Sequence, residues 1–195
     1  MKKAILRSFA VLMILSLSVC FGYLYSRFYE KYERASYPCD FEEYVSKYST
    51  QFGVPKEIIY SVIKTESDFK SNALSHAGAV GLMQITKDTY DWIAMKLGEK
   101  GEFALMYDPE TNIRYGTYLI SYLKLEYENW DTVFAAYNAG FGNVNKWLAD
   151  PECSDGNGVL KHIPFDETRA YVEKVNETRG IYSRLYPELI TESKN

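Results

Sequence analysis

The hydrophobic positions near the start of the chain form one unbroken run. After three basic residues, no charged residue occurs from Ser8 to Ser26. This length favours a membrane-spanning helix, which needs roughly 17–25 apolar residues, over the apolar region of a signal peptide, which has about 7–15. A buried helix of a globular domain would carry a polar stripe, and this run has none. We therefore expect a membrane anchor or signal segment over residues 1–27, followed by a linker over residues 28–39.

Two short features keep cleavage of this segment open. Small residues at Ser16 and Ser18 suit a signal-peptide cleavage site, and Leu17–Cys20 loosely resembles a lipoprotein box, with Val19 where a glycine or alanine is usual. The basic residues on the two sides of the run nearly balance, so charge gives little guidance on orientation. We expect a single-pass protein of the cell membrane whose following domain lies outside the cytoplasm. A secreted or lipid-anchored product after cleavage is the alternative.

From residue 40 onward the apolar positions recur every three or four residues, which is the spacing of helices that bury one face. Glycines follow two of these segments and suit left-handed helix ends, and aspartates precede two of them and suit caps. No alternating run predicts a strand. The pattern predicts a mainly α domain over residues 40–190 and a tail at 191–195. The expected helices are Asp40–Gly53, one from Pro55, Thr86–Gly98, Asp108 to about Asn129, Trp130–Gly140, and one or two within Phe165–Tyr186, with a loop over Asp150–Pro164.

Glu66 is a carboxylate on an otherwise apolar helix stripe. It follows Ile59, Val62 and Ile63 by seven, four and three residues, so it shares their face. Burial disfavours a charged carboxylate, and the negative end of the helix dipole acts in the same direction, so we expect a raised pKa. Such an acid can protonate the leaving oxygen of a glycosidic bond. Spacing alone equally allows Glu66 to reach solvent at the helix end or to pair with a base such as Arg169.

Composition narrows the function classes. Hydrophobic residues make up 47% of the 195 residues and charged residues 25%, which is typical of a folded domain. A net charge of −4 without a basic cluster argues against nucleic acid as a partner. The cysteines Cys20, Cys39 and Cys153 lie in no metal-binding spacing, so we expect neither metal nor cofactor. Cys39 and Cys153 are the pair that can form a disulfide outside the cytoplasm, if the fold brings them together.

Four motifs occur in order between Val54 and Val175. They are Glu66-Ser67, then SHAGAVGLMQI over Ser75–Ile85, AAYNAG over Ala135–Gly140, and IPFDETRAYVEKV over Ile163–Val175. Together they resemble the catalytic domain of the soluble lytic transglycosylases, a family with the lysozyme-like fold. One such motif is weak evidence, whereas four in the family's order are specific. The resemblance implies a lysozyme-like helical domain with a catalytic cleft.

The resemblance also implies roles for individual residues. Glu66 would be the catalytic acid and base, and Met83 an apolar residue that packs on sugar. Taken singly, Met83 and Tyr137 equally suit a core and Asn138 a helix cap. After Gln84 the family often has Leu-Met-Pro, which this chain lacks, and that difference should alter only the entry of the next helix. The implied substrate-binding residues are Ser67, Ser75, Met83, Gln84, Tyr137, Asn138, Glu167 and Tyr171.

The implied reaction is cleavage of peptidoglycan glycan strands without water. The family mechanism uses one glutamate and leaves a 1,6-anhydromuramic acid end. Asp68 is a poor second carboxylate for Glu66, because two residues along a helix it points elsewhere. Two alternatives remain: a hydrolytic muramidase that uses Glu167 or another distant acid, and a non-catalytic wall scaffold that only binds glycan. We expect a monomer that binds glycan strands and reaches the membrane through its N-terminal helix.

Overall fold

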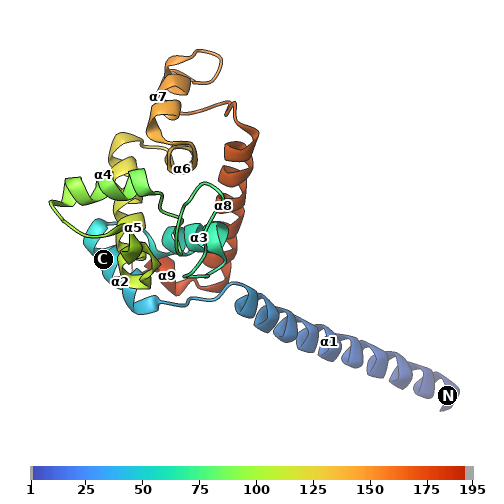
Figure 1. Cartoon of the computed structure of the whole chain (residues 1–195). Coiled ribbons are helices and arrows are strands. Elements are labelled where there is room, and N and C mark those ends of the chain that lie inside the picture. Colours follow the sequence, from blue (N-terminus) through green and yellow to red (C-terminus); the bar gives the residue numbers. More distant parts are fainter. Residues whose placement is uncertain (1, 192–195) are drawn as a thin grey trace. The chain divides into compact units, whose positions relative to one another are not determined.

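The computed structural model of the chain describes residues 2–191 and divides into two units, Met1–Pro38 and Cys39–Asn195. Of the tail expected at 191–195, only Thr191 is described, and it ends the last helix. The two units are described separately below, and the helices are labelled in Figure 1.

The first unit is a single helix, α1 (Lys2–Ser36), which does not end at residue 27. Most of the expected linker is therefore helical. The reason lies in charged pairs at helical spacing, since Glu30 lies within ion-pair distance of both Arg27 and Arg34. Leu12–Ser36 is long and apolar enough to cross a membrane by length and composition, with a mean hydropathy of 1.3 in its most apolar window.

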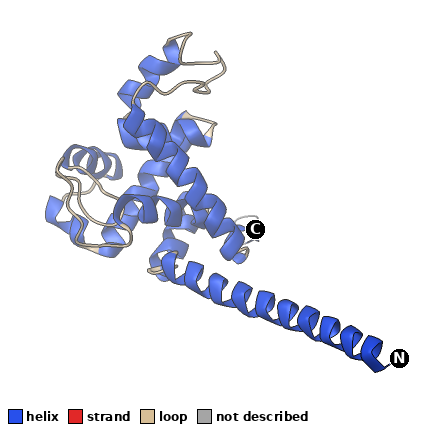
Figure 2. Ribbon diagram, turned by 90° about the vertical axis from the view of Figure 1, so that its right-hand side faces the viewer, coloured by secondary structure: helices blue, strands red, loops and turns tan. Residues whose placement is uncertain are grey.

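The second unit is built from helices and loops, as Figure 2 shows for the described residues. Strand-like pairing between residues 39 and 191 is limited to isolated bridges, such as those of Val80 with Leu74 and Ile85. The mainly α prediction is confirmed. The elements are α2 (Glu42–Phe52), α3 (Lys56–Ser67), α4 (Lys87–Leu97), η1 (Phe103–Tyr107), α5 (Pro109–Glu126), α6 (Trp130–Ala139), α7 (Phe141–Ala149), α8 (Asp166–Leu185) and α9 (Glu188–Thr191).

Most helix ends follow from local chemistry. The Asp108 side chain accepts a hydrogen bond from the Thr111 amide at the start of α5, and Gly53 ends α2 with φ 67°. The cap predicted at Asp40 is wrong, because α2 starts after Phe41, which has φ 61° and makes no side-chain cap. Helix α5 stops at Glu126 rather than near Asn129, since Asn129 caps α6.

The core of the domain lies between α3 and α8, which pack against each other (Figure 1). The stripe residues Ile59, Val62 and Ile63 are fully buried, and Tyr60 stacks on Tyr182 with ring centroids 5.5 Å apart. Helices η1 and α7 were not expected. Helix α7 starts directly after Gly140, whose backbone (φ 83°, ψ 144°) turns the chain between two helices without an intervening loop.

Candidate active site

Glu66 is the penultimate residue of α3, at the negative end of the helix dipole. Its side chain is partly exposed, whereas the stripe residues before it are sealed in the core. Arg169, the alternative ion-pair partner, instead donates to the Ile163 carbonyl and the Asp166 carboxylate. Helix α3 therefore places the Glu66 carboxyl group at the surface of a pocket, and Arg169 does not pair with it.

Burial raises the pKa of Glu66 to about 7, as its position predicted. The Tyr171 hydroxyl and the Lys174 ammonium, both from α8, act in the opposite direction and limit the rise in pKa. The Tyr171 oxygen is itself buried and makes no hydrogen bond of ordinary geometry within the described residues. A hydroxyl beside the acid is thus available to donate to it when it ionises.

The pocket in front of Glu66 has a volume of about 570 Å³. That volume is in the range of small-ligand sites. Its floor and walls come from the end of α3, the loop before α4, the middle of α5, the end of α6 and the start of α8. The structure brings six predicted site residues to this pocket: Glu66, Ser75, Gln84, Tyr137, Asn138 and Glu167.

Three predicted residues do not line the pocket. Met83 is fully buried, and its sulfur fills the space where a side chain at Gly116 would begin, 2.3 Å from an ideal Cβ. In this structure its side chain therefore packs in the core and does not line the pocket, and its packing on sugar stays a prediction. Ser67 is also buried and its hydroxyl donates to the Leu82 carbonyl at 2.8 Å, while Tyr171 lies behind Glu66.

The loop between α3 and α4 is held by side chains that bind its backbone. The Tyr137 hydroxyl donates to the Met83 carbonyl at 2.7 Å, and the side-chain amide of Gln84 donates through Nε2 to the Gly81 carbonyl at 2.8 Å. Gln84 has φ 50°, an unusual backbone for a side-chain-bearing residue. The Ser75 hydroxyl accepts from the Ala79 amide at 3.0 Å. Several residues expected to touch substrate therefore also shape the loop.

Asn112 of α5 is the central support of this loop. Its Oδ1 accepts from the Met83 amide at 2.7 Å, and its Nδ2 donates to the carbonyls of Val80 and Met106 at 2.9 and 2.8 Å. The side chain is fully buried. Asn112 was not predicted from the sequence. Like Glu66, it is a polar residue on an otherwise apolar helix stripe, and it lies four residues before buried Gly116 of α5.

Asn138 and Glu167 line the other side of the pocket. The Asn138 Oδ1 accepts from the Thr168 hydroxyl at 2.8 Å, which joins the end of α6 to the start of α8. Glu167 is exposed at the rim and is a second carboxylate lining the pocket. Its exposure contrasts with the burial of Glu66.

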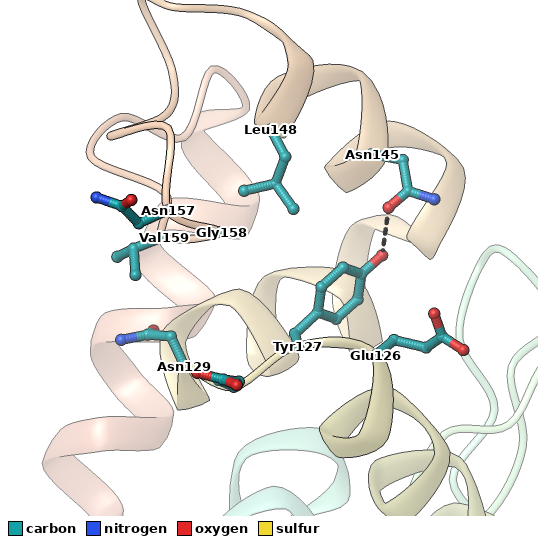
Figure 3. Close-up of a pocket in the computed structure, with 9 residues that line it drawn as sticks. Glu126, Tyr127, Asn129, Asn145, Leu148, Asn157, Gly158 and Val159 are labelled. Carbon is teal, nitrogen blue, oxygen red and sulfur yellow. Dashed lines mark hydrogen bonds between the residues drawn. The ribbon is translucent and has the colours of Figure 1, made fainter.

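A second hollow of about 530 Å³ lies at the end of α5, against α7 and the loop near residue 158 (Figure 3). Figure 3 shows the Tyr127 hydroxyl directed to Asn145, and the hydrogen bond between them measures 2.7 Å. The carboxylates there, Glu126 and Glu128, are exposed. None of its acids is buried, which distinguishes this hollow from the pocket in front of Glu66.

The cysteines and the metal-ligating side chains form no cluster in the described part of the chain. Cys153 is buried and outside any disulfide, so the Cys39–Cys153 bond considered from the sequence is not formed. Among the described residues, no group of three or more metal-ligating side chains is placed to hold an ion.

Comparison with known proteins gives a consistent result. The chain is 32% identical over 144 residues to the soluble lytic murein transglycosylase of Escherichia coli K12, covering 71% of this chain and 22% of that protein. It is 30% identical over 166 residues to the membrane-bound lytic murein transglycosylase C of Sodalis glossinidius, covering 72% of this chain and 46% of that one. The chain thus spans less than half of the curated relatives it matches.

Solved structures confirm the predicted lysozyme-like fold. The 70 kDa soluble lytic transglycosylase of Escherichia coli superposes with a TM-score of 0.70 at 29% identity, over 78% of this chain and 25% of that one. An inactive variant of lytic transglycosylase Slt from Pseudomonas aeruginosa gives a TM-score of 0.68 at 31% identity, over 76% and 24%. The family model described as the transglycosylase SLT domain matches residues 43–157, most of the helical unit. This protein therefore belongs to the transglycosylase SLT domain family.

Proposed function

We propose that the helical domain cleaves peptidoglycan glycan strands between N-acetylmuramic acid and N-acetylglucosamine, with Glu66 as both acid and base. The observation that carries this proposal is the half-buried carboxyl of Glu66, whose pKa is raised to about 7 on the surface of a pocket. A group with this pKa is partly protonated near neutral pH and can give and take a proton in one cycle. The named activities of the related proteins support the same class of reaction.

In the proposed reaction, protonated Glu66 donates to the glycosidic oxygen, which leaves with N-acetylglucosamine as the bond to C1 of the muramic acid breaks. The 2-acetamido group of that sugar assists, and its 6-hydroxyl then bonds to C1. Ionised Glu66 takes the proton of this hydroxyl and is ready for another cycle. The product is a 1,6-anhydro end, and no water is consumed. The relative solved as an inactive variant carries glutamine in place of a glutamate, which agrees with a reaction that depends on one acid.

A hydrolytic muramidase is the second candidate, and the presence of Glu167 in the same pocket favours it. In that reaction Glu167 would activate a water, so the product would carry a reducing end. Glu167 is exposed at the rim, so the pocket does not shield a water beside it from bulk solvent, and this makes hydrolysis the less favoured candidate. Glycan binding without turnover is the third possibility.

We further propose that α1 anchors the domain at the outer face of the cell membrane. Its apolar stretch Leu12–Ser36 and the exposure of its described side chains support this proposal. Aromatic residues that suit a membrane interface follow the most apolar part, among them Tyr25, Tyr29 and Tyr32.

One experiment tests these proposals together. Washed membranes and the soluble fraction of expressing cells are incubated with purified peptidoglycan, and the masses of the released products are measured by mass spectrometry. We expect anhydro ends, one water lighter than reducing ends, from the membrane fraction, and a loss of about 10²–10⁴-fold in Glu66→Gln. Glu173→Gln, which removes an exposed glutamate of α8 outside the pocket, is the matched control.

Each part of the proposal has its own contrary result. Reducing ends alone, together with loss of turnover in Glu167→Gln, would establish the muramidase. Unchanged turnover in Glu66→Gln would remove Glu66 from the reaction. Activity found only in the soluble fraction would contradict the anchor.

A further inference from the structure

Three aromatic rings from three different helices meet beside the pocket. We name them the aromatic cluster: Trp92 of α4, Tyr122 of α5 and Phe141 of α7. The rings of Trp92 and Tyr122 meet edge to face with centroids 4.7 Å apart, and Trp92 lies 6.2 Å from Phe141. Edge-to-face and tilted pairs of this kind are favourable and hold the rings in fixed directions.

The aromatic cluster is not sealed in the core. Phe141 is 49% exposed, and Trp92 and Tyr122 are each partly exposed. Met95, on the turn of α4 after Trp92, is also exposed, so apolar surface continues around the rings. An apolar surface shared by several helices and left in contact with water is a feature of binding sites more than of ordinary packing.

The position of the cluster relative to the pocket is fixed by its helices. Thr89 lines the pocket and lies three residues before Trp92, one turn away on the same face of α4. Leu119 lines the pocket and lies three residues before Tyr122 on α5. The third ring follows directly after Gly140, which also lines the pocket. Each ring therefore lies within one helical turn, or one residue, of a residue that lines the pocket, which places the cluster beside the pocket.

Other contacts keep this surface rigid and give it a charge. The Lys96 ammonium lies 5.6 Å from the ring centre of Trp92 and 5.5 Å from that of Tyr122. Helix α7 is fixed against the end of α5 by the hydrogen bond between Tyr127 and Asn145 (Figure 3). The cluster is therefore a preorganised aromatic surface with a cation beside it.

We propose that the aromatic cluster is an additional sugar subsite, which binds one pyranose ring of the glycan strand after the strand leaves the pocket in front of Glu66. This inference rests on the proposed function, since it names where that substrate continues. A pyranose presents a face of C–H groups that packs on an aromatic ring, while its hydroxyls stay in water. The Lys96 ammonium beside the rings can form ion pairs with carboxylates of the peptides that muramic acid carries. A glycan strand has both features at regular spacing, whereas an apolar protein partner would leave Lys96 without an anionic group to meet.

The test separates binding at the cluster from catalysis. Glu66→Gln serves as the background, and binding of N-acetylglucosamine oligomers of two to six units and of purified glycan strands is measured by calorimetry. Adding Phe141→Ala should weaken binding of the longest oligomers and of strands by up to about tenfold, because the apolar contact between the ring and a pyranose is lost. Binding of the shortest oligomers, which fill only the pocket, should not change. Leu125→Ala, at an 86% exposed apolar position of α5 outside the cluster, is the matched control.

Conservative variants distinguish stacking from support of the fold. Phe141→Tyr should restore binding of long oligomers, whereas Phe141→Leu, which keeps an apolar side chain, should not. Equal weakening for all oligomer lengths, or full binding in Phe141→Leu, would overturn the inference. If the background protein binds no glycan of any length, both the subsite and the proposed substrate are wrong. If Glu66→Gln leaves turnover intact while Phe141→Ala still weakens long oligomers, the subsite stands and only the catalytic assignment fails.

Discussion

The pocket has two walls that are built by different physical means. One wall is helical: Glu66 ends α3, Tyr171 stands behind it on α8, and apolar packing between these helices fixes both. The other wall is the loop between α3 and α4, and side-chain hydrogen bonds to its backbone hold it in place. Asn112 provides two of those bonds, to Met83 and Val80, and Tyr137 provides another, while a third bond from Asn112 reaches Met106 of η1.

This difference separates two tasks. In the helical wall, packing removes water from a carboxyl group and thereby sets its pKa, which is a requirement of the chemistry. In the loop wall, hydrogen bonds hold a backbone that has no regular secondary structure. This wall thereby keeps the shape of the pocket. We therefore expect changes in the loop wall to act first on stability, and changes in the helical wall to act first on the pH dependence of the acid.

The largest stability effect is expected from Asn112→Ala. The change leaves the Met83 amide and the Met106 carbonyl without a partner in a fully buried site, whereas the Val80 carbonyl keeps its bond from the Ile85 amide. Each unsatisfied buried group costs roughly 1–3 kcal/mol, and relaxation of the loop recovers part of it, so the free energy of unfolding should fall by about 3 kcal/mol. Urea unfolding of the full chain in detergent measures this fall.

Asn176→Ala is the control for that measurement. Asn176 donates to Asp131 in an exposed hydrogen bond, and its loss should cost less than about 1 kcal/mol. Equal effects of the two substitutions would show that the loop does not depend on Asn112, and the comparison of the two walls would lose its basis.

A smaller effect on stability is expected from Glu66→Gln, and it depends on pH. The pKa of Glu66 is about 7 in the folded protein against an ordinary 4.5. The folded state therefore holds this proton more tightly, and the stability it contributes is complete below about pH 4.5 and lost as the pH rises to about 7. Relative to Glu66→Gln, the wild type should lose on the order of 2 kcal/mol between pH 4 and pH 8, allowing for its partial exposure. Glu173→Gln should show no such difference, and a pH-independent gap for Glu66→Gln would contradict the raised pKa.

The helical wall was predictable from the sequence because its signal is periodic. Glu66 stands where the stripe of Ile59, Val62 and Ile63 requires an apolar residue, and the structure places it at a pocket with a raised pKa. The same reasoning was available for Asn112, whose neighbours on the stripe are also buried. A buried amide on such a stripe suits a structural hydrogen bond as well as a functional role, so the pattern alone does not indicate a site.

The loop wall could not be predicted in this way. Its hydrogen bonds join residues far apart in the chain, such as Met83 with Asn112 and with Tyr137, and periodicity carries no information about such pairs. Motif membership also does not tell which way a side chain points. Met83 was therefore expected to contact sugar, while its side chain in fact fills the space above Gly116. Helix α7 was missed because one glycine both ends α6 and begins the next helix.

The smallest effect is expected from changes to two tyrosines near Glu66. Tyr171 lowers the pKa of Glu66, whereas the Tyr137 hydroxyl donates to the Met83 carbonyl of the loop. Without the Tyr171 hydroxyl, the ionised acid loses a donor, so Tyr171→Phe should raise the pKa of Glu66 and move the fall of kcat/KM above pH 7 upward, by less than about one pH unit. Tyr137→Phe leaves that donor in place and should instead raise KM and lower stability, with the pH profile unchanged. The pH dependence of strand cleavage by the three proteins decides between these outcomes. A shift in both variants would mean that the loop wall also influences the pKa of Glu66, and a shift in neither would mean that the Tyr171 hydroxyl does not lower that pKa.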